Sequence, residues 1–179
     1  ETIEEKKLDQ VQQILSSGEF FLKYSKKYWN LYEESKGKDQ PMLIAIAMQS
    51  QMYFRESILN LTTLLSQNRK EANIECLFTN KDRASVLHNK LDLLRKDFKD
   101  SRLKDIRNEI IAHKQRSKIG DPLVLYLNRF ADTWYVKAED IYEKVHIYLY
   151  ENFDAIEGGG MEDIYEESFD YLYKKFQNN

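Results

Sequence analysis

The sequence is poor in residues that cross-link or interrupt a chain: its 179 residues include one cysteine, two prolines and six glycines. The single cysteine, Cys76, excludes an intramolecular disulfide framework and a zinc site built from several cysteines, and it suits a reducing cytosol. With 42% hydrophobic residues, the composition also excludes collagen-like and disordered chains. We therefore expect one folded, helical, cytoplasmic protein.

Long apolar runs and common phosphate-binding or hydrolase motifs are absent as well. The longest apolar run, PMLIAIAM at 41–48, is far shorter than the roughly 20 residues of a membrane helix. The first residues, ETIEEKKLDQ, are polar and mixed in charge, which is unlike a signal peptide. No glycine-rich phosphate loop and no GxSxG elbow occurs. We expect no membrane helix, no nucleoside triphosphatase and no serine hydrolase.

The chain has little net charge, −3, but the charge is unevenly distributed. Between Arg95 and Lys118, nine lysines or arginines stand against four acidic residues, a local charge of +5. From Asp132 onward, four stand against twelve, a local charge of −8. The basic segment is compatible with a nucleic-acid partner, and a solvated charged helix face is the alternative.

Apolar spacing predicts helices along most of the chain. Residues 2–35 are predicted to form one or two opening helices, with Gly18 as a break or bend. Asp39 and Pro41 mark the cap and first turn of a long helix that extends to about Ser66. The predicted core seam of that helix is Ala47, Phe54, Ile58, Leu61 and Leu65.

Three further helices are predicted after a looser segment, 67–80, in which EANIECLF has a short helical pattern. They cover 82–98, 101–116 and 132–153. The apolar face of the first is Val86, Leu87, Leu91, Leu94 and Phe98. The apolar face of the third is Trp134, Ala138, Ile141, Val145, Leu149 and Phe153.

The C-terminal part contains one ambiguous segment and one clear helix. Residues 122–131 include LVLYL, which is strand-like in composition, although the sequence offers no partner strand. After EGGG, a terminal helix carries an aromatic stripe of Tyr165, Phe169, Leu172 and Phe176. We predict an all-α helical bundle with a four-helix core and extra N- and C-terminal helices. Residues 1–156 form the bundle, and 157–179 form a glycine hinge and a C-terminal helix of the same domain, which docks on the body or on another subunit.

The segment DIRNEIIAHKQRSK, residues 105–118, begins within the predicted 101–116 helix. Asp100 or Ser101 can cap this helix. At about 100° per residue, one arc of the helix, from 0° to near 140°, is apolar. Its members are Ile106, Ile110, Leu103 and Ile111.

Arg107 falls in the middle of this arc and His113 at one edge of it. With Ile106 at 0°, Arg107 lies near 100° and His113 near −20°, about 9 Å apart along the axis. An arginine that faces an apolar surface costs several kcal/mol of desolvation unless an anion meets it. That anion is either a carboxylate of a neighbouring helix or a phosphate, which a planar guanidinium can hold while His113 transfers protons nearby.

The stretch RNEIIAH at 107–113 resembles the Arg–polar–His motif of the HEPN superfamily (higher eukaryotes and prokaryotes nucleotide-binding). The longer phrase LKDIRNEIIAHKQ, preceded by MQSQMYFRESILNLTTLLSQNRKEANIECL, resembles the abortive-infection AbiU-type branch of that superfamily. The similarity covers residues 40–150. It implies a four-helix bundle that dimerises with two motif helices face to face, and a metal-independent endoribonuclease activity.

The resemblance also implies a role for each motif residue. Two copies of His113 would supply the base and the acid for cleavage through the RNA 2′-hydroxyl, Arg107 would hold the phosphate, and Asn108 would orient the histidine or a phosphate oxygen. The surrounding basic residues would contact RNA; these are Arg102, Lys104, Lys114, Arg116 and Lys118. We expect no cofactor.

A toxin or phage-defence role follows from the same resemblance, with RNA as substrate, a homodimer as the assembly and an antitoxin protein as a partner. Some relatives carry a tyrosine two residues after the histidine, where an antitoxin enzyme modifies it. Gln115 stands at that position here, which argues against this form of regulation. The alternative is a non-catalytic helical interaction module, or a nucleotide- or RNA-binding module.

One further pattern concerns metals. Glu143 and His146 form an E-x-x-H pair, the spacing of helical di-iron sites. Such a site needs a second pair and two more glutamates, but Ser85 stands three residues before His88. We therefore expect no metal site and interpret His88 and His146 as ordinary helix residues.

Overall fold

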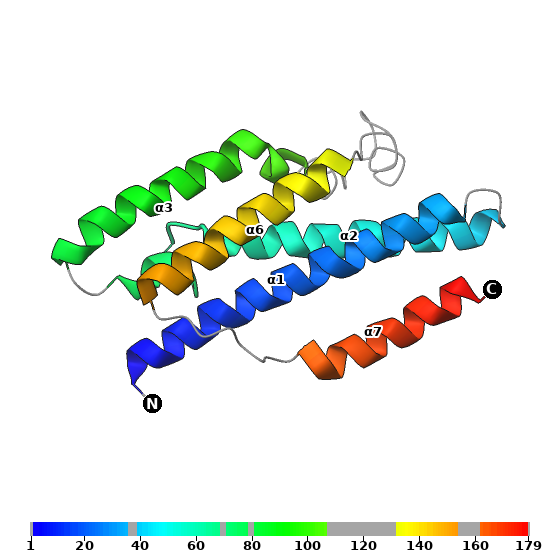
Figure 1. The fold of residues 1–179 in the computed structure, drawn as a ribbon, viewed down its shortest axis with the longest axis horizontal. Helices are drawn as coiled ribbons and strands as arrows, with labels where there is room; N and C mark the ends of the chain where they lie inside the picture. Colours follow the sequence, from blue (N-terminus) through cyan, green and yellow to red (C-terminus); the bar gives the residue numbers. More distant parts are fainter. Residues whose placement is uncertain are drawn as a thin grey trace.

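The protein is an α-helical bundle in the computed structural model, which describes residues 2–35, 39–68, 71–78, 81–106, 132–153 and 162–178. Within these ranges no strand occurs. The elements are α1 (Ile3–Glu34), α2 (Gln40–Leu64), the 3-10 helix η1 (Ile74–Leu77), α3 (Lys81–Ser101), α6 (Asp132–Phe153) and α7 (Glu162–Gln177). The prediction of an all-α bundle is confirmed (Figure 1). None of these described helices has both the length and the apolar content needed to cross a bilayer.

The first helix, α1, is continuous over 32 residues. It begins with a capping box, in which the Thr2 hydroxyl accepts from the backbone N–H of Glu5 and the Glu5 carboxylate accepts from that of Thr2. Gly18 lies inside this helix, so of the two predicted alternatives the single helix is confirmed and a break at Gly18 is wrong. Position 18 needs glycine for another reason: a Cβ atom there would lie 2.1 Å from the hydroxyl oxygen of Tyr142 on α6.

The hydrogen bonds of Tyr142 hold its phenol against α1. Its hydroxyl donates to the backbone carbonyl of Ser57 at 2.6 Å and accepts from the Ser57 hydroxyl at 3.1 Å. Burial of the ring raises the pKa of Tyr142. Because the phenol is fixed from the α2 side, α1 and α6 can approach this closely only where α1 lacks a side chain.

We expect Gly18→Ala to lower the free energy of unfolding by about 1–3 kcal/mol. The clash with the buried phenol outweighs the roughly 1 kcal/mol that alanine contributes in a helix interior. Urea unfolding followed by circular dichroism measures this change. Gln13→Ala, exposed on the same helix, is the control and should shift stability by at most about 0.5 kcal/mol. A Gly18→Ala chain more stable than the wild type would contradict the packing role of this glycine.

The second helix, α2, starts as predicted and ends slightly earlier. Asp39 occupies the N-cap position and Pro41 lies in the first turn, although the Asp39 side chain makes no capping hydrogen bond. The last helical residue is Leu64 rather than Ser66. The whole predicted seam is buried, namely Ala47, Phe54, Ile58, Leu61 and Leu65. Of the described helix pairs, α1 and α2 share the most extensive contact.

The central core lies between α1, α2, α3 and α6 (Figure 1). The contribution of α3 is Leu87, Leu91, Leu94 and Phe98. Val86 was predicted for the same face but is 61% exposed, because it lies about 100° from Leu87 on the helix. The contribution of α6 includes Ala138, Ile141, Val145 and Leu149, as predicted. Since α1 adds Val11, Leu15, Leu22 and Trp29, it belongs to the core itself and is more than an N-terminal addition.

The last helix, α7, packs on α1 and α2 over a second apolar cluster. Phe169 and Phe176 of the predicted stripe lie there together with Tyr173. Leu172 was predicted for the stripe but is 46% exposed, because it lies about 60° from Phe169 around the helix. The side chain of Tyr165, the glycine hinge and residues 122–131 lie outside the described part of the chain.

Candidate functional site

Most residues of the predicted site lie outside the described ranges. These are Arg107, Asn108, His113, Lys114, Arg116 and Lys118. The structure describes the chain up to Ile106, which includes Arg102 and Lys104 of the predicted RNA-binding set. What can be described is therefore the start of the motif-bearing segment and its connection to α3.

The helical conformation is interrupted at Arg102, between α3 and the helical residues 103–106. Arg102 has a φ of 62°, in the left-handed region that costs a side-chain-bearing residue about 1–2 kcal/mol. The Ser101 hydroxyl donates to the Phe98 carbonyl at 2.6 Å and accepts from the backbone N–H of Leu103 at 3.3 Å. Of the two predicted caps, Asp100 and Ser101, it is the serine that meets the N–H group of the new helical segment.

Arg102 and the four helical residues after it divide between the bundle and the solvent. Leu103 is fully buried and Ile106 packs partly buried against the central core. Arg102 and Lys104 are exposed, and Arg102 pairs with Asp105 at 3.5 Å. Of the four apolar positions that the helical wheel assigns to the inner face, the two within the described residues, Leu103 and Ile106, do lie on it.

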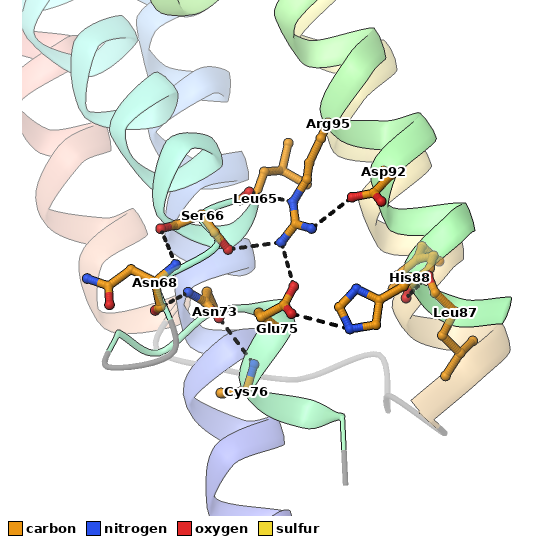
Figure 2. Close-up of polar contacts among 11 residues, drawn as sticks. Leu65, Ser66, Asn68, Asn73, Glu75, Cys76, Leu87, His88, Asp92 and Arg95 are labelled. Atoms are coloured by element: carbon orange, nitrogen blue, oxygen red, sulfur yellow. Dashed lines mark hydrogen bonds and ion pairs between the residues drawn. The ribbon is translucent and has the colours of Figure 1, made fainter. Parts of the chain in front are cut away.

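Within the described part of the chain, Arg95 on α3 points its guanidinium toward the bundle (Figure 2). It donates to the Glu75 carboxylate at 2.8 Å, and the two side chains are 13% and 7% exposed. It also donates to the backbone carbonyls of Leu65 and Ser66 at 2.9 and 3.1 Å. The ion pair is therefore largely removed from water and held by several charge-assisted hydrogen bonds.

This ion pair ties the connection after α2 to α3. The two carbonyls that Arg95 meets follow the last turn of α2, where helical partners are missing, so the guanidinium caps that end. The Asn73 side chain accepts from the backbone N–H of Cys76 at 3.2 Å and donates to the Asn68 carbonyl at 2.7 Å. These bonds hold η1 in the place where Glu75 reaches Arg95.

His88 and Asp92, one turn apart on α3, complete the cluster (Figure 2). The His88 Nε2 atom lies 3.3 Å from a Glu75 oxygen, and its ring packs on Phe78 with centroids 4.3 Å apart. Asp92 lies 3.0 Å from Arg95 on the solvent side. Both oxygens of Glu75 are thus engaged, so the cluster neutralises the buried charge of Arg95 within the chain.

The described residues do not assemble a metal site. No group of three or more His, Cys, Asp or Glu among them has an arrangement that could hold a metal ion. His146 of the E-x-x-H pair lies 3.7 Å from Glu19 of α1. The partner of this histidine is therefore a carboxylate on a neighbouring helix.

A buried hydroxyl network was not predicted. The Tyr135 hydroxyl lies 2.8 Å from the Ser25 hydroxyl and 3.1 Å from the Ser50 hydroxyl, and each serine donates to the backbone carbonyl of the other. The network joins α1, α2 and α6 in the interior. A signal was available, because Ser25 and Ser50 each follow a core residue, Leu22 and Ala47, by three positions and so share its face.

We expect Glu75→Gln to lower the free energy of unfolding by about 3 kcal/mol, because it leaves the Arg95 charge buried without its anion. The matched control is Asp92→Asn, which removes the carboxylate on the other side of the same arginine. Asp92 is 59% exposed, so this change should cost less than about 1 kcal/mol. Urea unfolding of both variants checks the difference, and equal losses would contradict the assignment.

No family model, curated protein or solved structure matches this chain.

Proposed function

We propose that the chain is a HEPN-like, metal-independent endoribonuclease that acts as a dimer in a toxin or phage-defence role. The observation that carries the proposal is the start of the motif helix, where Leu103 and Ile106 pack into the bundle while Lys104 is exposed. The helical wheel that puts Arg107 and His113 on the inner side of the helix requires this same amphipathic orientation. The exposed lysine and arginine beside it, in a segment of net charge +5, support binding to an RNA backbone.

The proposed chemistry needs three groups at one phosphate. A base removes the proton of the RNA 2′-hydroxyl, whose oxygen attacks the adjacent phosphorus, and an acid protonates the 5′-oxygen that leaves. The products are a 2′,3′-cyclic phosphate and a 5′-hydroxyl. His113 is the proton-transfer group, and Arg107 stabilises the negative charge that grows on the phosphate oxygens. Asn108 orients the histidine or an oxygen of the phosphate.

A dimer solves the shortage of proton-transfer groups in this motif. His113 is the motif's one histidine, and one imidazole cannot readily serve as base and acid in the same step. Two motif helices that meet face to face bring two copies of His113 and two of Arg107 to one phosphate. The pairing also brings the phosphate anion to two arginines that otherwise face an apolar surface.

A second function, a non-catalytic helical interaction module, is favoured by the cluster around Arg95. In that cluster the bundle already neutralises an inward arginine with a buried carboxylate, Glu75. If Arg107 were met in the same way, it would hold helices together and would not be available for phosphate.

We expect the purified wild-type chain to cleave single-stranded RNA in the presence of EDTA. Arg107→Ala and His113→Ala should each lower the cleavage rate at least about 100-fold, the range for losing a general acid or base or a charge-stabilising group. Gel analysis with end-group mapping measures the rate and identifies the 2′,3′-cyclic phosphate.

Matched controls come from exposed residues of the same types. Arg55→Ala on α2 and His146→Ala on α6 remove an arginine and a histidine that lie on the surface, and both should cleave at the wild-type rate. Cleavage that persists in both motif variants, or an absence of cleavage by the wild type, would contradict the proposal and favour the interaction module.

A further inference from the structure

The helix α7 covers a surface of α1 and α2 that is separate from the central core (Figure 1). We call this surface the α7 docking face, and it consists of Phe20, Lys23, Tyr24, Lys27, Tyr28 and Tyr53. No described residue of α7 belongs to the central core. Release of α7 would therefore leave the packing between α1, α2, α3 and α6 intact.

Charges on the two sides of this contact are complementary. Lys23 donates to Glu166, and Lys27 donates to Asp170 at 3.1 Å. The Tyr24 hydroxyl donates to the same Asp170 carboxylate at 3.0 Å. The hydrogen bond from Lys27 holds the pKa of Asp170 below its usual range. The basic members come from α1 and the acidic ones from α7, so the docking face selects an acidic helix in one orientation.

Aromatic rings fill the space between the charged pairs. Phe169 lies with its ring centroid 4.9–5.1 Å from three rings of the docking face, those of Phe20, Tyr24 and Tyr53. Tyr173 and Phe176 meet Tyr28 edge-on at 5.6 and 5.9 Å. The spacing of four and three residues places these three α7 rings on one stripe of the helix. The docking face thus recognises a helix with acidic and aromatic residues at defined positions.

We propose that the α7 docking face also binds α7 of a second copy of this chain, so that two chains exchange their C-terminal helices reciprocally. The second copy is the occupant because its α7 reproduces the Lys23–Glu166 and Lys27–Asp170 pairs and the ring contacts without change. Reciprocal exchange buries both docking faces and forms a closed, two-fold symmetric dimer. This inference does not depend on ribonuclease activity or on the motif helix.

The balance between the two arrangements depends on chain concentration. Eight residues separate Phe153 from Glu162, a tether that spans at most roughly 30 Å. A helix on a short tether has an effective concentration in the millimolar range. The chain's own α7 therefore occupies the docking face in dilute solution. The exchanged dimer reaches a population comparable to that of the unexchanged chain near 1 mM, or wherever copies are brought together.

Zero-length cross-linking of the wild-type chain tests the exchange directly. Equal amounts of ¹⁵N-labelled and unlabelled chain are mixed, equilibrated and treated with a carbodiimide, which joins Lys23 to Glu166 and Lys27 to Asp170. Mass spectrometry then separates cross-linked peptide pairs of one isotope from mixed pairs. At about 1 mM chain, roughly a quarter of these pairs should be mixed, and at about 10 µM at least tenfold fewer. Cross-links without mixed pairs at 1 mM would overturn the proposal.

Charge reversal provides a matched second measurement at low concentration. One chain carries K23E and K27E, another carries E166K and D170K, and each has like charges facing one another within the chain. When the two are mixed at about 10 µM, exchange restores opposite charges across both contacts, so mixed pairs should rise at least tenfold above the wild-type level. A single chain that carries all four changes restores the pairing internally and should stay at the wild-type level. Equal levels in the mixture and in the four-change chain would refute exchange.

Discussion

The buried ion pair between Glu75 and Arg95 fixes the geometry on which the rest of the bundle depends. It connects η1 to α3 and at the same time caps the end of α2 through two backbone carbonyls. The contact holds α3 together with its core residues Leu87, Leu91, Leu94 and Phe98, and the motif-bearing segment begins where α3 ends, at Ser101. A charge removed from water is therefore used to position the segment that carries the proposed site.

The helical wheel predicts the same physical problem for Arg107, for which we propose a different answer. Arg95 has a carboxylate from its own chain, and its desolvation is offset within the fold. Arg107 was placed by the helical wheel on the face that Leu103 and Ile106 show to be the inner one. If its anion is a phosphate, the desolvation of Arg107 is offset only when the ligand binds. Binding and catalytic sites commonly contain such residues, which lower the stability of the free protein.

Periodicity predicted the helices and most of the core because both depend on local spacing. The seam of α2 and the buried face of α6 follow directly from intervals of three, four and seven residues. Val86 and Leu172 were misplaced because each lies beside the true stripe, where only packing decides which side chain is covered. Gly18, the Glu75–Arg95 pair and the Ser25–Ser50–Tyr135 network depend on partners distant in sequence. Local spacing places Ser25 and Ser50 on the inner face of their helices but does not reveal which residues they meet. For the site, the sequence could narrow the cap to Asp100 or Ser101 and predict the inward positions of Leu103 and Ile106, and the structure selects Ser101.

Paired unfolding measurements decide whether Arg107 is reserved for a ligand, as we propose, or stabilises the fold. Arg95→Met and Arg107→Met replace each guanidinium by an apolar side chain of similar length, and urea denaturation gives the free energy of unfolding. Arg95→Met should lower stability by about 3 kcal/mol, because it leaves Glu75 buried without its cation. Arg107→Met should leave stability within about 1 kcal/mol of the wild type, or raise it, while RNA cleavage is lost. An equally large loss of stability for Arg107→Met would contradict the account, because it would show that a structural carboxylate meets this arginine.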